Sequence, residues 1–451
     1  MRGTSSDLHL FRVGDCCLAF DVNSGSLHRL DEVAWEILRH VAGGRSWEAA
    51  EREAAERFPL QEVEEASREL RELQERGELL TADPGWEEFA PGNELGLKAL
   101  CLNIAHSCNL SCSYCFVPGD VRSEGALMPL EVIRGALDLL IQESPYEFVT
   151  VDFFGGEPLL NFEGIRFAVE YARERGREKR WKFTLTTNAT LLDDAVLAFC
   201  REHGISLVLS CDGRPEVHDR HRLTRGGRGT SSLVEKRLRR FFETGACGEY
   251  YVRGTYTRFN LDFAEDVKHL AGLGARSVSL EPVVAPEDEP YALRFEDLDR
   301  IRDEYLRLAR LLLELEEKGT PVTFYHFAID LSGGPCAAKR MTGCGAGYQY
   351  LAVAPGGEIY PCHQFVGNRE YLLGNVREGI TNRELRERFL GAHIYRKEPC
   401  RSCWARFLCG GGCHAQAALL EGDILRPHRL SCELMRMRLE AALYYIAQRL
   451  R

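Results

Sequence analysis

Hydrophobic and polar residues follow two different periods along the chain, and the change between them divides it. Residues 8–30 form short apolar runs broken by turn residues at 14–15 and 23–25, which predicts three strands. Residues 31–75 carry hydrophobic residues at helical spacing, with Asp31 and Ser46 placed as N-caps, and this predicts three helices. We therefore expect one small domain over residues 1–82 and a linker, marked by proline and glycine, over 83–97.

From residue 97 onward, short apolar strands alternate with longer helical patterns. The predicted helices occupy the gaps between six predicted strands, which span 98–104, 147–154, 181–187, 205–211, 249–256 and 275–281. This alternation indicates an α/β fold of parallel βαβ units. Six units are too few for a closed barrel of eight, so we expect a partial (β/α)6 barrel over 98–285. Its reactive residues should lie at the C-terminal ends of the strands.

The last third of the chain has a different character. A connecting region over 286–331 holds an amphipathic helix with apolar residues from 298 to 315 on one face. Residues 332–451 are rich in glycine and cysteine and lack long periodic runs, apart from a final helix at 434–450. A domain with so little apolar repeat needs additional cross-links, and bound metal would supply them.

Composition narrows the classes of partner. The chain of 451 residues has 57 Lys and Arg against 68 Asp and Glu, a net charge of −11, and no basic block. We therefore expect neither nucleic acid nor a membrane as the main partner. The chain contains neither a run of ~20 apolar residues nor an export-type start, which predicts a cytoplasmic protein. In that reducing compartment we expect the 17 cysteines to supply metal ligands rather than a disulfide framework.

The first cysteine motif follows the first barrel strand. Cys108, Cys112 and Cys115 form a CxxxCxxC pattern that can surround one soft metal centre. Four thiolates close an iron–sulfur or zinc site, whereas three leave one metal position open for an exogenous ligand. The alternative is a zinc site completed by His106.

A glycine motif ends the second barrel strand. Gly155, Gly156 and Glu157 precede Pro158, and paired glycines allow close approach of the backbone to a ligand. The carboxylate beside them can accept hydrogen bonds from an ammonium group. GGEP alone is a weak signal, but its place one βα unit after CxxxCxxC makes it strong.

Together these motifs resemble the radical S-adenosylmethionine (SAM) superfamily, over about residues 98 to 281. The resemblance implies a [4Fe-4S] cluster on Cys108, Cys112 and Cys115 whose open iron binds SAM. It implies that one-electron reduction then cleaves SAM to a 5′-deoxyadenosyl radical. The residues that it implies for SAM binding are Gly155, Gly156 and Glu157 for the amino group, Asn188 and Ser210 near ribose and methionine, and Arg253 for the carboxylate. Arg253 as a strand-end ion pair is an equal alternative, and His218-Asp219 are expected only to order a loop.

Seven cysteines near the C-terminus form a further pattern. They are Cys344, Cys362, Cys400, Cys403, Cys409, Cys413 and Cys432, and their spacing resembles the SPASM extension. This implies two auxiliary [4Fe-4S] clusters, one on Cys400, Cys403, Cys409 and Cys432 and the other on Cys344, Cys362 and Cys413, for three clusters in all. In the second set either Cys336 is the fourth ligand or an iron stays open for a substrate thiolate. The alternative is a pair of structural zinc sites. The remaining cysteines are expected to be buried small hydrophobic residues, namely Cys16, Cys17, Cys101, Cys200, Cys211 and Cys247.

The substrate is expected to be a peptide, as for most SPASM-type proteins. The N-terminal domain resembles the winged-helix-like leader-recognition element of ribosomal-peptide maturases, which would add the leader as a strand to a sheet edge. The alternative is a domain that only packs on the barrel. Segments 99–106, 251–255, 345–347 and 360–365 are similar to thioether-forming maturases of SCIFF peptides. The expected function is therefore Cys-to-carbon thioether formation in a Cys-rich precursor peptide, with an electron donor such as flavodoxin or ferredoxin.

The nearest competing function is that of the anaerobic sulfatase maturases, which form formylglycine. They carry an aspartate as base directly after the cysteine equivalent to Cys362, where this chain has His363, and they lack the leader-binding domain. His363 is the candidate proton acceptor here, although a packing histidine is an equal alternative. Two other classes remain open, a three-cluster electron carrier and a zinc-stabilised peptide-binding scaffold.

Overall fold

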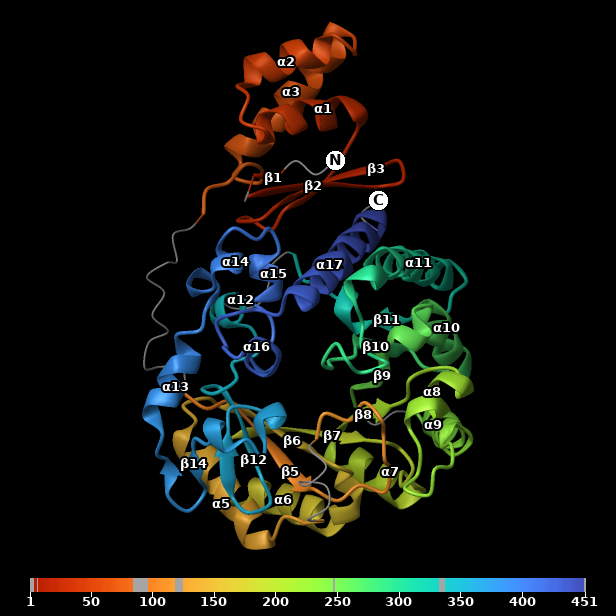
Figure 1. Ribbon diagram of the computed structural model, residues 1–451, viewed down its shortest axis with the longest axis vertical. Coiled ribbons are helices and arrows are strands. Elements are labelled where there is room, and N and C mark those ends of the chain that lie inside the picture. The colour runs from red at the N-terminus through yellow and green to blue at the C-terminus, as the bar shows by residue number, and fades with distance from the viewer. Residues whose placement is uncertain are drawn as a thin grey trace.

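The structure is a computed structural model that describes residues 4–5, 7–83, 96–117, 125–245, 248–331 and 337–449. Most of the predicted linker, together with Cys247 and Cys336, lies outside these described residues. Figure 1 shows the N-terminal elements β1 to α3, which we call the N-terminal unit, at one end of the molecule. The large sheet and its helices lie at the other end.

The N-terminal unit is a four-stranded antiparallel sheet with three helices on one face. Its strands follow the order β1-β2-β3-β4, and Asp31 and Ser46 cap α1 and α2 as predicted. The three predicted strands and three helices are confirmed, and the short β1 is an addition. The elements are β1 (Thr4–Ser5), β2 (Leu8–Val13), β3 (Cys16–Asp21), β4 (Leu27–Leu30), α1 (Glu32–Ala42), α2 (Trp47–Ala55) and α3 (Leu60–Glu75).

All six strands predicted for the barrel are present, adjacent and parallel, in the order β5 to β10. The elements of this part are β5 (Ala99–Ala105), α5 (Leu130–Glu143), β6 (Phe148–Gly155), α6 (Phe162–Arg175), β7 (Arg180–Thr187), α7 (Asp194–His203), β8 (Ser206–Ser210), α8 (Pro215–His221), α9 (Ser231–Thr244), β9 (Tyr250–Tyr256), α10 (Phe263–Leu273) and β10 (Ser277–Pro282). The helix predicted from residue 298 follows as α11 (Leu298–Glu317).

The sheet continues beyond these six strands on both sides. β11 (Thr323–Phe324) pairs with β10, and β12 (Tyr350–Val353) pairs in parallel with β5, the first barrel strand. Three further strands, β13 (Glu358–Tyr360), β14 (Gly374–Asn375) and β15 (Gly379–Ile380), extend the sheet past β12. The C-terminal cysteine-rich region is therefore built onto the barrel sheet, a connection that the pattern of six strands did not predict.

Side chains alternate between the two faces of the barrel strands. On β6, Val149, Val151 and Phe153 are buried against the helices, whereas Thr150, Asp152 and Phe154 face the other way and are only partly buried. The same alternation places Lys182 and Thr184 of β7 on this second face. We call it the concave face, because the helices cover the opposite one.

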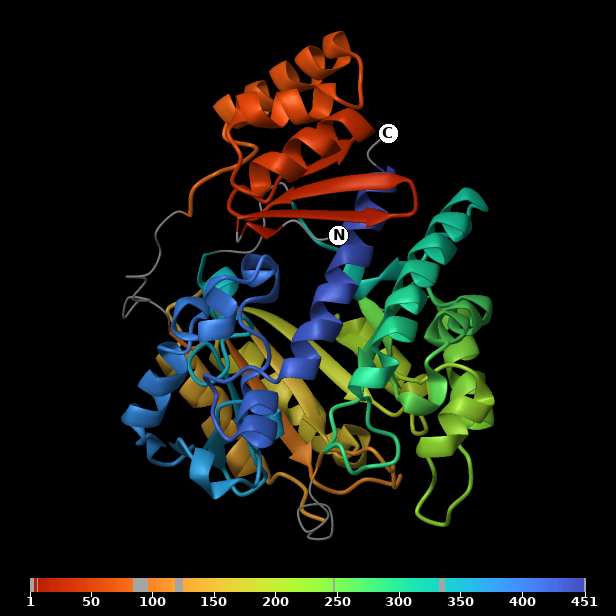
Figure 2. The ribbon, with the colours of Figure 1, turned by 45° about the horizontal axis from the view of Figure 1, so that its top comes forward.

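Short elements dominate the C-terminal region until its last helix. They are α12 (Ala337–Thr342), α13 (Arg383–Leu390), α14 (Glu398–Arg401), α15 (Arg406–Cys409) and α16 (His414–Glu421). The final helix α17 (Arg429–Arg449) packs against α11 and reaches the N-terminal unit (Figure 2). Within the described ranges, every helix falls short of the length and apolar character that a membrane crossing demands.

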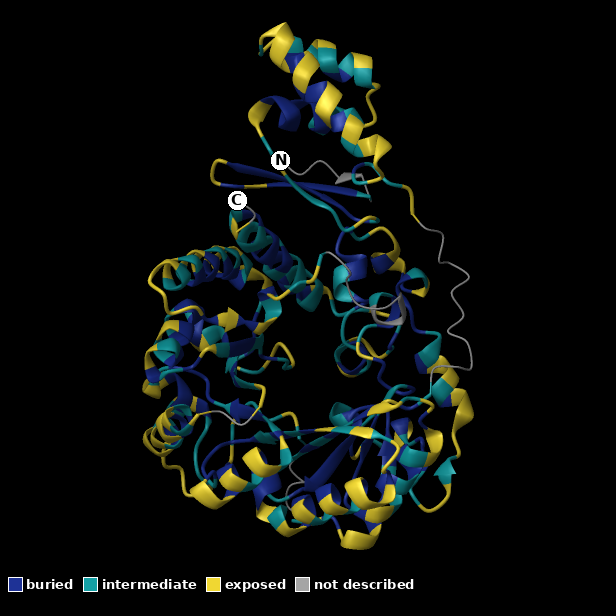
Figure 3. Cartoon of the chain, turned by 180° about the vertical axis from the view of Figure 1, so that it is seen from behind, coloured by how far each residue is buried: buried dark blue, intermediate teal, exposed yellow. Residues whose placement is uncertain are grey.

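The sheet of the N-terminal unit is buried on both faces (Figure 3). Leu8, Leu10 and Ala19 pack against α1, α2 and α3. On the opposite face, Phe11, Leu18 and Phe20 belong to a second apolar cluster, whose other members come from the cysteine-rich region and α17, namely Met341, Ile394, Cys400, Trp404, Ala405, Phe407, Leu439, Leu443 and Ala447. The N-terminal unit is thus docked on the region that carries the C-terminal cysteines.

Two polar contacts add specificity to this interface. The ring of His9 stacks on Trp404 at 3.8 Å between centroids, and His9 Nε2 lies 3.1 Å from Glu440 of α17. The buried guanidinium of Arg406 donates hydrogen bonds to Asp7 at 2.8 Å and to Asn23 at 2.7 Å. Asp7 and Asn23 belong to the N-terminal unit, and Arg406 also donates to Asp83, which follows that unit, at 3.3 Å.

We expect Arg406→Met to destabilise the protein by about 2–3 kcal/mol, because a buried, hydrogen-bonded charge is lost and its anionic partner remains. Arg388→Met is the matched control, since Arg388 pairs with Asp423 at the exposed surface and such pairs contribute about 1 kcal/mol or less. Urea unfolding of both variants measures the difference. Equal shifts in the two midpoints would show that the Arg406 network does not hold the interface.

Candidate functional site

The loop of Cys108, Cys112 and Cys115 leaves the C-terminal end of β5, as predicted, and a second loop holds it in place. Ser111 N donates to Leu223 O at 2.8 Å and Ser113 N to His221 O at 3.1 Å. The side chains of Ser113 and His221 also form a hydrogen bond of 2.7 Å. The backbone of this loop is therefore anchored at the sequence positions between the cysteines, which leaves the thiols grouped on one side.

An ion pair lies beside the same thiols. Arg222 contacts the fully buried Asp212 at 3.0 Å, and Tyr114 Oη donates to the same carboxylate at 2.5 Å. Sequence reasoning placed Ser210 near SAM but missed Asp212 as an ion-pair partner and Arg222, which no motif contains. Asp212 is thus bonded to other side chains of the protein. Ser210 is the partly buried polar residue at the end of β8.

Burial makes these thiols poor thiolates on their own. Burial raises the pKa of Cys112 to about 11, against the lowering effect of Arg222, and the charges of Cys115 and Cys108 raise it further. Burial likewise raises the pKa of Cys108, which Cys115 and Glu157 also raise. A metal centre deprotonates a coordinating thiol outright, so the set is suited to bind one. The three thiols fit the cluster that the sequence motif implies.

The described residues contain no group of three or more His, Cys, Asp or Glu side chains spaced to hold one metal ion. The thiols nevertheless lie close enough for Cys115 and Cys108 to raise the pKa of Cys112.

The glycines of the GGE motif serve a packing role against the cysteine loop. Gly155 has a φ of +129°, and a Cβ built there would lie 2.2 Å from Ala105 O; one on Gly156 would lie 2.2 Å from Ser107 O. Gly156 N donates to Ala105 O at 2.7 Å, and Glu157 N to Ser107 O at 2.9 Å. The close approach seen here is therefore to the backbone that leads into Cys108.

Glu157 is fully buried and both of its carboxylate oxygens accept hydrogen bonds. Oε1 accepts from Thr187 Oγ1 at 2.8 Å, and Oε2 accepts from Asn188 N at 2.8 Å. Burial raises the pKa of Glu157 to about 7 in spite of these donors. Glu157 thus joins the end of β6 to the end of β7, next to the thiols.

Asn188 completes this connection. Its side-chain amide donates to Asn109 Oδ1 at 2.9 Å and lies 3.9 Å from Cys108 Sγ. The predicted residues Glu157 and Asn188 therefore lie together with the thiol set, although the structure tests neither as a SAM ligand. The pair His218-Asp219 orders a loop, as expected, because Asp219 accepts hydrogen bonds from Thr230 and Ser231.

Arg253 and His363 meet on the concave face. Arg253 of β9 is adjacent to Ser210 of β8 and forms no ion pair among the described residues, so the alternative of a structural ion pair is not observed. The carboxylate next to it, Glu281, is instead paired with His326 at 3.2 Å and Arg438 at 3.1 Å. Burial and the charge of Arg253 lower the pKa of His363 to about 4, which makes its ring neutral at pH 7.

His363 also links the cysteine-rich region to the first motif. Its ring lies 4.7 Å from that of Phe154, directly before Gly155, and 5.7 Å from that of Phe116, directly after Cys115. Since His363 follows Cys362, these contacts bring the auxiliary thiols to the side of the barrel where the first thiol set lies. The contacts with two aromatic rings favour the packing alternative for this histidine.

The C-terminal thiols separate into the two sets that the SPASM pattern implies. Burial, then Cys413 and Cys344, raise the pKa of Cys362 well above its usual value. Burial raises the pKa of Cys400 to about 12 and that of Cys432 to about 11, and thiols of their own set, Cys409 and Cys403, raise both further. These electrostatic neighbours group the thiols by proximity, and their roles as cluster ligands stay a prediction.

A buried lysine lies between these two sets, and no sequence motif indicated it. Lys397 Nζ donates to Gly411 O at 2.8 Å. Burial lowers the pKa of Lys397, whereas thiols from both sets raise it, namely Cys400, Cys409, Cys413 and Cys344. A positive charge fixed at Lys397 offsets negative charge in the thiol set on either side of it.

The other predicted cysteines are buried, as expected for small hydrophobic residues. They are Cys16, Cys17, Cys101, Cys200 and Cys211. Three of them also have polar neighbours: Asp152 and Tyr350 act on the thiol of Cys101, Glu32 on that of Cys17, and Asp212 on that of Cys211.

Glu157→Gln is expected to weaken SAM binding about tenfold, because the amide can accept at one atom only and leaves a buried N–H donor unsatisfied, at a cost of about 1–3 kcal/mol. The control is Glu163→Gln, on the exposed face of α6. Anaerobic equilibrium dialysis with SAM measures both. Identical affinities would remove Glu157 from the organisation of the site.

Comparison with known proteins identifies these regions. Residues 102–258 match the model of the radical SAM superfamily, and residues 344–404 match an iron–sulfur cluster-binding domain termed SPASM. A serine-type anaerobic sulfatase-maturating enzyme of Klebsiella aerogenes is 25% identical over 348 residues, which cover 72% of this chain and 81% of that one.

Two solved structures share the fold. Native anSMEcpe with bound AdoMet has a TM-score of 0.65 and 22% identity, over 78% of this chain and 99% of that one. Streptococcus suis SuiB bound to precursor peptide SuiA has a TM-score of 0.54 and 17% identity, over 96% and 100%. The chain therefore contains a radical SAM domain, which binds SAM, and a SPASM domain, which binds iron–sulfur clusters.

Proposed function

We propose that this protein matures a Cys-rich, ribosomally synthesised precursor peptide by forming thioether bonds between cysteine sulfur and carbon. The observation that carries the proposal is the position of the three-thiol set of Cys344, Cys362 and Cys413. Its neighbour His363 packs against the residues that flank Cys115 and Gly155. Sulfur and carbon can therefore be presented at one place, between the SPASM region and the SAM motif.

The residues proposed to hold the cofactors are those of the three thiol sets. Cys108, Cys112 and Cys115 would hold the SAM-binding cluster, with Gly155, Gly156, Glu157, Asn188, Ser210 and Arg253 around SAM. When the cluster and SAM are bound and the cluster is reduced, they supply a 5′-deoxyadenosyl radical that removes a hydrogen atom from carbon. The two C-terminal sets would hold auxiliary clusters, and a flavodoxin or ferredoxin would supply the reducing electron.

The count of three thiols in one auxiliary set supports a thiol substrate. Among the described residues, the pKa of Cys362 responds to two other thiols, Cys413 and Cys344. A set of three leaves one metal position for a further sulfur ligand, and a substrate cysteine has the required chemistry. Cys336, the other candidate for the fourth position, lies outside the described residues.

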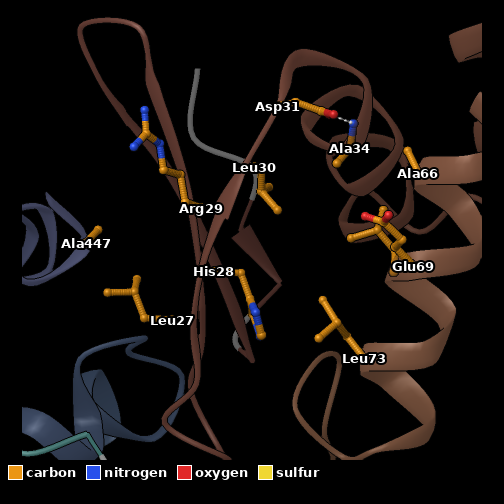
Figure 4. Close-up of a pocket in the computed structure, with 11 residues that line it drawn as sticks. Leu27, His28, Arg29, Leu30, Asp31, Ala34, Ala66, Glu69, Leu73 and Ala447 are labelled. Carbon is orange, nitrogen blue, oxygen red and sulfur yellow. Dashed lines mark hydrogen bonds between the residues drawn. The ribbon is translucent and has the colours of Figure 1, made fainter. Parts of the chain in front are cut away.

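The N-terminal unit offers a site for the leader of such a peptide. β4 is the edge strand of its sheet, and a groove of about 510 Å³ runs between β4 and α3. Figure 4 shows Leu30 and His28 on the strand facing Ala66, Glu69 and Leu73 on the helix. An extended peptide can pair with the free edge while its apolar side chains enter the groove. SuiB, which shares this fold, is described as bound to its precursor peptide.

The second candidate is the formation of formylglycine in a protein substrate. It is favoured by the similarity to a sulfatase-maturating enzyme over 72% of this chain. Those enzymes are expected to use an aspartate after the cysteine equivalent to Cys362. The neutral His363 at that position, with a pKa near 4, is a poor proton acceptor at pH 7 and so does not replace that aspartate.

The experiment combines the anaerobically reconstituted enzyme, a chemical reductant, SAM and a Cys-rich precursor peptide with its leader. We expect 5′-deoxyadenosine together with a peptide lighter by two hydrogens for each bridge, measured by mass spectrometry. A product that has lost sulfur and gained oxygen would support the second candidate. SAM cleavage that leaves the peptide unchanged would contradict both.

We expect Leu73→Glu to weaken leader binding about tenfold or more, because it places a charge in the apolar part of the groove. Leu60→Glu is the matched control, since Leu60 begins the same helix and is 63% exposed. Fluorescence anisotropy with a labelled leader measures both affinities. Equal binding by the two variants would place the leader elsewhere.

A further inference from the structure

Asp152 is a carboxylate on the concave face to which neither the sequence motifs nor the proposed cofactor sites assign a role. It lies on β6, three residues before Gly155, and shares its face of the strand with Phe154. It accepts a hydrogen bond from Thr184 on β7. Among the described residues it has no ion-pair partner.

The neighbours of Asp152 show that it points toward the interior. Its charge affects Cys101 on β5, Tyr251 on β9 and Tyr350 on β12, which are strands on both sides of β6. The remaining charged group facing it is Lys182 on β7. These are the titratable and charged side chains around Asp152, and Lys182 is the one cation among them.

Tyr350 connects Asp152 to the three-thiol set. The phenol of Tyr350 lies 3.3 Å from His363 Nδ1, and its pKa is raised by burial and then by Cys101, Asp152 and Cys362. Phe154 lies beside the same histidine at 4.7 Å between ring centroids. Asp152 therefore lies close to Tyr350 and Phe154, which both contact His363. The proposed function brings the substrate sulfur and carbon together beside His363.

We propose that Asp152 is the catalytic residue that accepts the proton of the substrate thiol. This inference rests on the proposed function. In the balanced reaction the carbon–hydrogen bond breaks and its hydrogen atom goes to the 5′-deoxyadenosyl radical. The S–H proton goes to the Asp152 carboxylate, the carbon–sulfur bond forms, and the surplus electron leaves to an iron–sulfur acceptor of the SPASM domain.

The chemical environment agrees with this role. A carboxylate has about four acceptor positions, and Thr184 occupies one of them, so capacity remains for a substrate S–H. Burial raises the pKa of Asp152, although Thr184 and Lys182 oppose that effect, and a raised pKa makes a carboxylate a better proton acceptor. Glu281 on the same face is unsuited, because the guanidinium of Arg438 at 3.1 Å already neutralises it.

The test compares the reconstituted Asp152→Asn variant with wild type and with a control variant, Thr150→Val. Thr150 lies two residues before Asp152, on the same face of β6. We expect Asp152→Asn to lose about 100-fold or more of its thioether formation, while iron content and 5′-deoxyadenosine formation stay within about threefold. Thr150→Val should keep the wild-type rate. Asp152→Glu, which keeps a carboxylate, should recover part of the activity.

A selenocysteine peptide separates proton transfer from a structural role. A selenol is already ionised at neutral pH and needs no acceptor, so the selenium peptide should restore product formation by Asp152→Asn. Failure of this rescue, or a wild-type rate for Asp152→Asn with the cysteine peptide, would overturn the proposal while leaving the proposed function intact. If wild type itself forms no thioether, the proposed function and this inference are overturned together.

Discussion

The parallel pairing of β12 with β5 is the constraint on which the arrangement of the site depends. β5 ends at Ala105, directly before the loop of Cys108, and β12 leads through a hairpin to Cys362. The register from Tyr350 opposite Ala99 to Val353 opposite Leu102 fixes the two strands side by side. β13 runs antiparallel to β12, so Cys362 follows a strand that returns toward the start of β5, whereas the loop of Cys108 leaves the end of β5. The contacts of His363 with Phe116 and Phe154 join the two cysteine-bearing segments across the concave face.

The docking of the N-terminal unit determines which part of its sheet is left for a peptide. One face of its sheet is used by its own helices and the other by α17 and the cysteine-rich region. The edges at β1 and β4 are therefore left for a partner strand, and β4 is the longer of the two. The stacking of His9 on Trp404, the residue after Cys403, places this interface next to a thiol set. A leader bound at β4 would therefore be held at a fixed distance from the auxiliary site. Holding the substrate in this way raises the local concentration of its core segment.

Sequence analysis predicted the local features of this protein well. The strands of the barrel and the caps at Asp31 and Ser46 follow from spacing within short windows, and the structure agrees with both. The ligand sets of the C-terminal cysteines come from the resemblance to the SPASM extension and stay a prediction. The β12–β5 pairing could not be predicted in this way, because it joins residues about 250 positions apart and hydrophobic periodicity carries no record of a strand's partner. Arg222 and Lys397 were missed for the same reason, since each acts through neighbours that are distant in sequence.

The concave face also shows why residue type alone cannot assign a role to a carboxylate. Glu281 and Asp152 lie on strands of one sheet, yet their surroundings separate them. Burial would raise the pKa of Glu281, but His326, Arg438 and Arg253 lower it strongly, and the carboxylate is fixed as an anion beside the guanidinium of Arg438. Burial raises the pKa of Asp152, and only the hydrogen bond from Thr184 and the charge of Lys182 act against this rise. When two like groups are driven apart in this way, the one held by cations serves the structure and the other is left available for proton transfer.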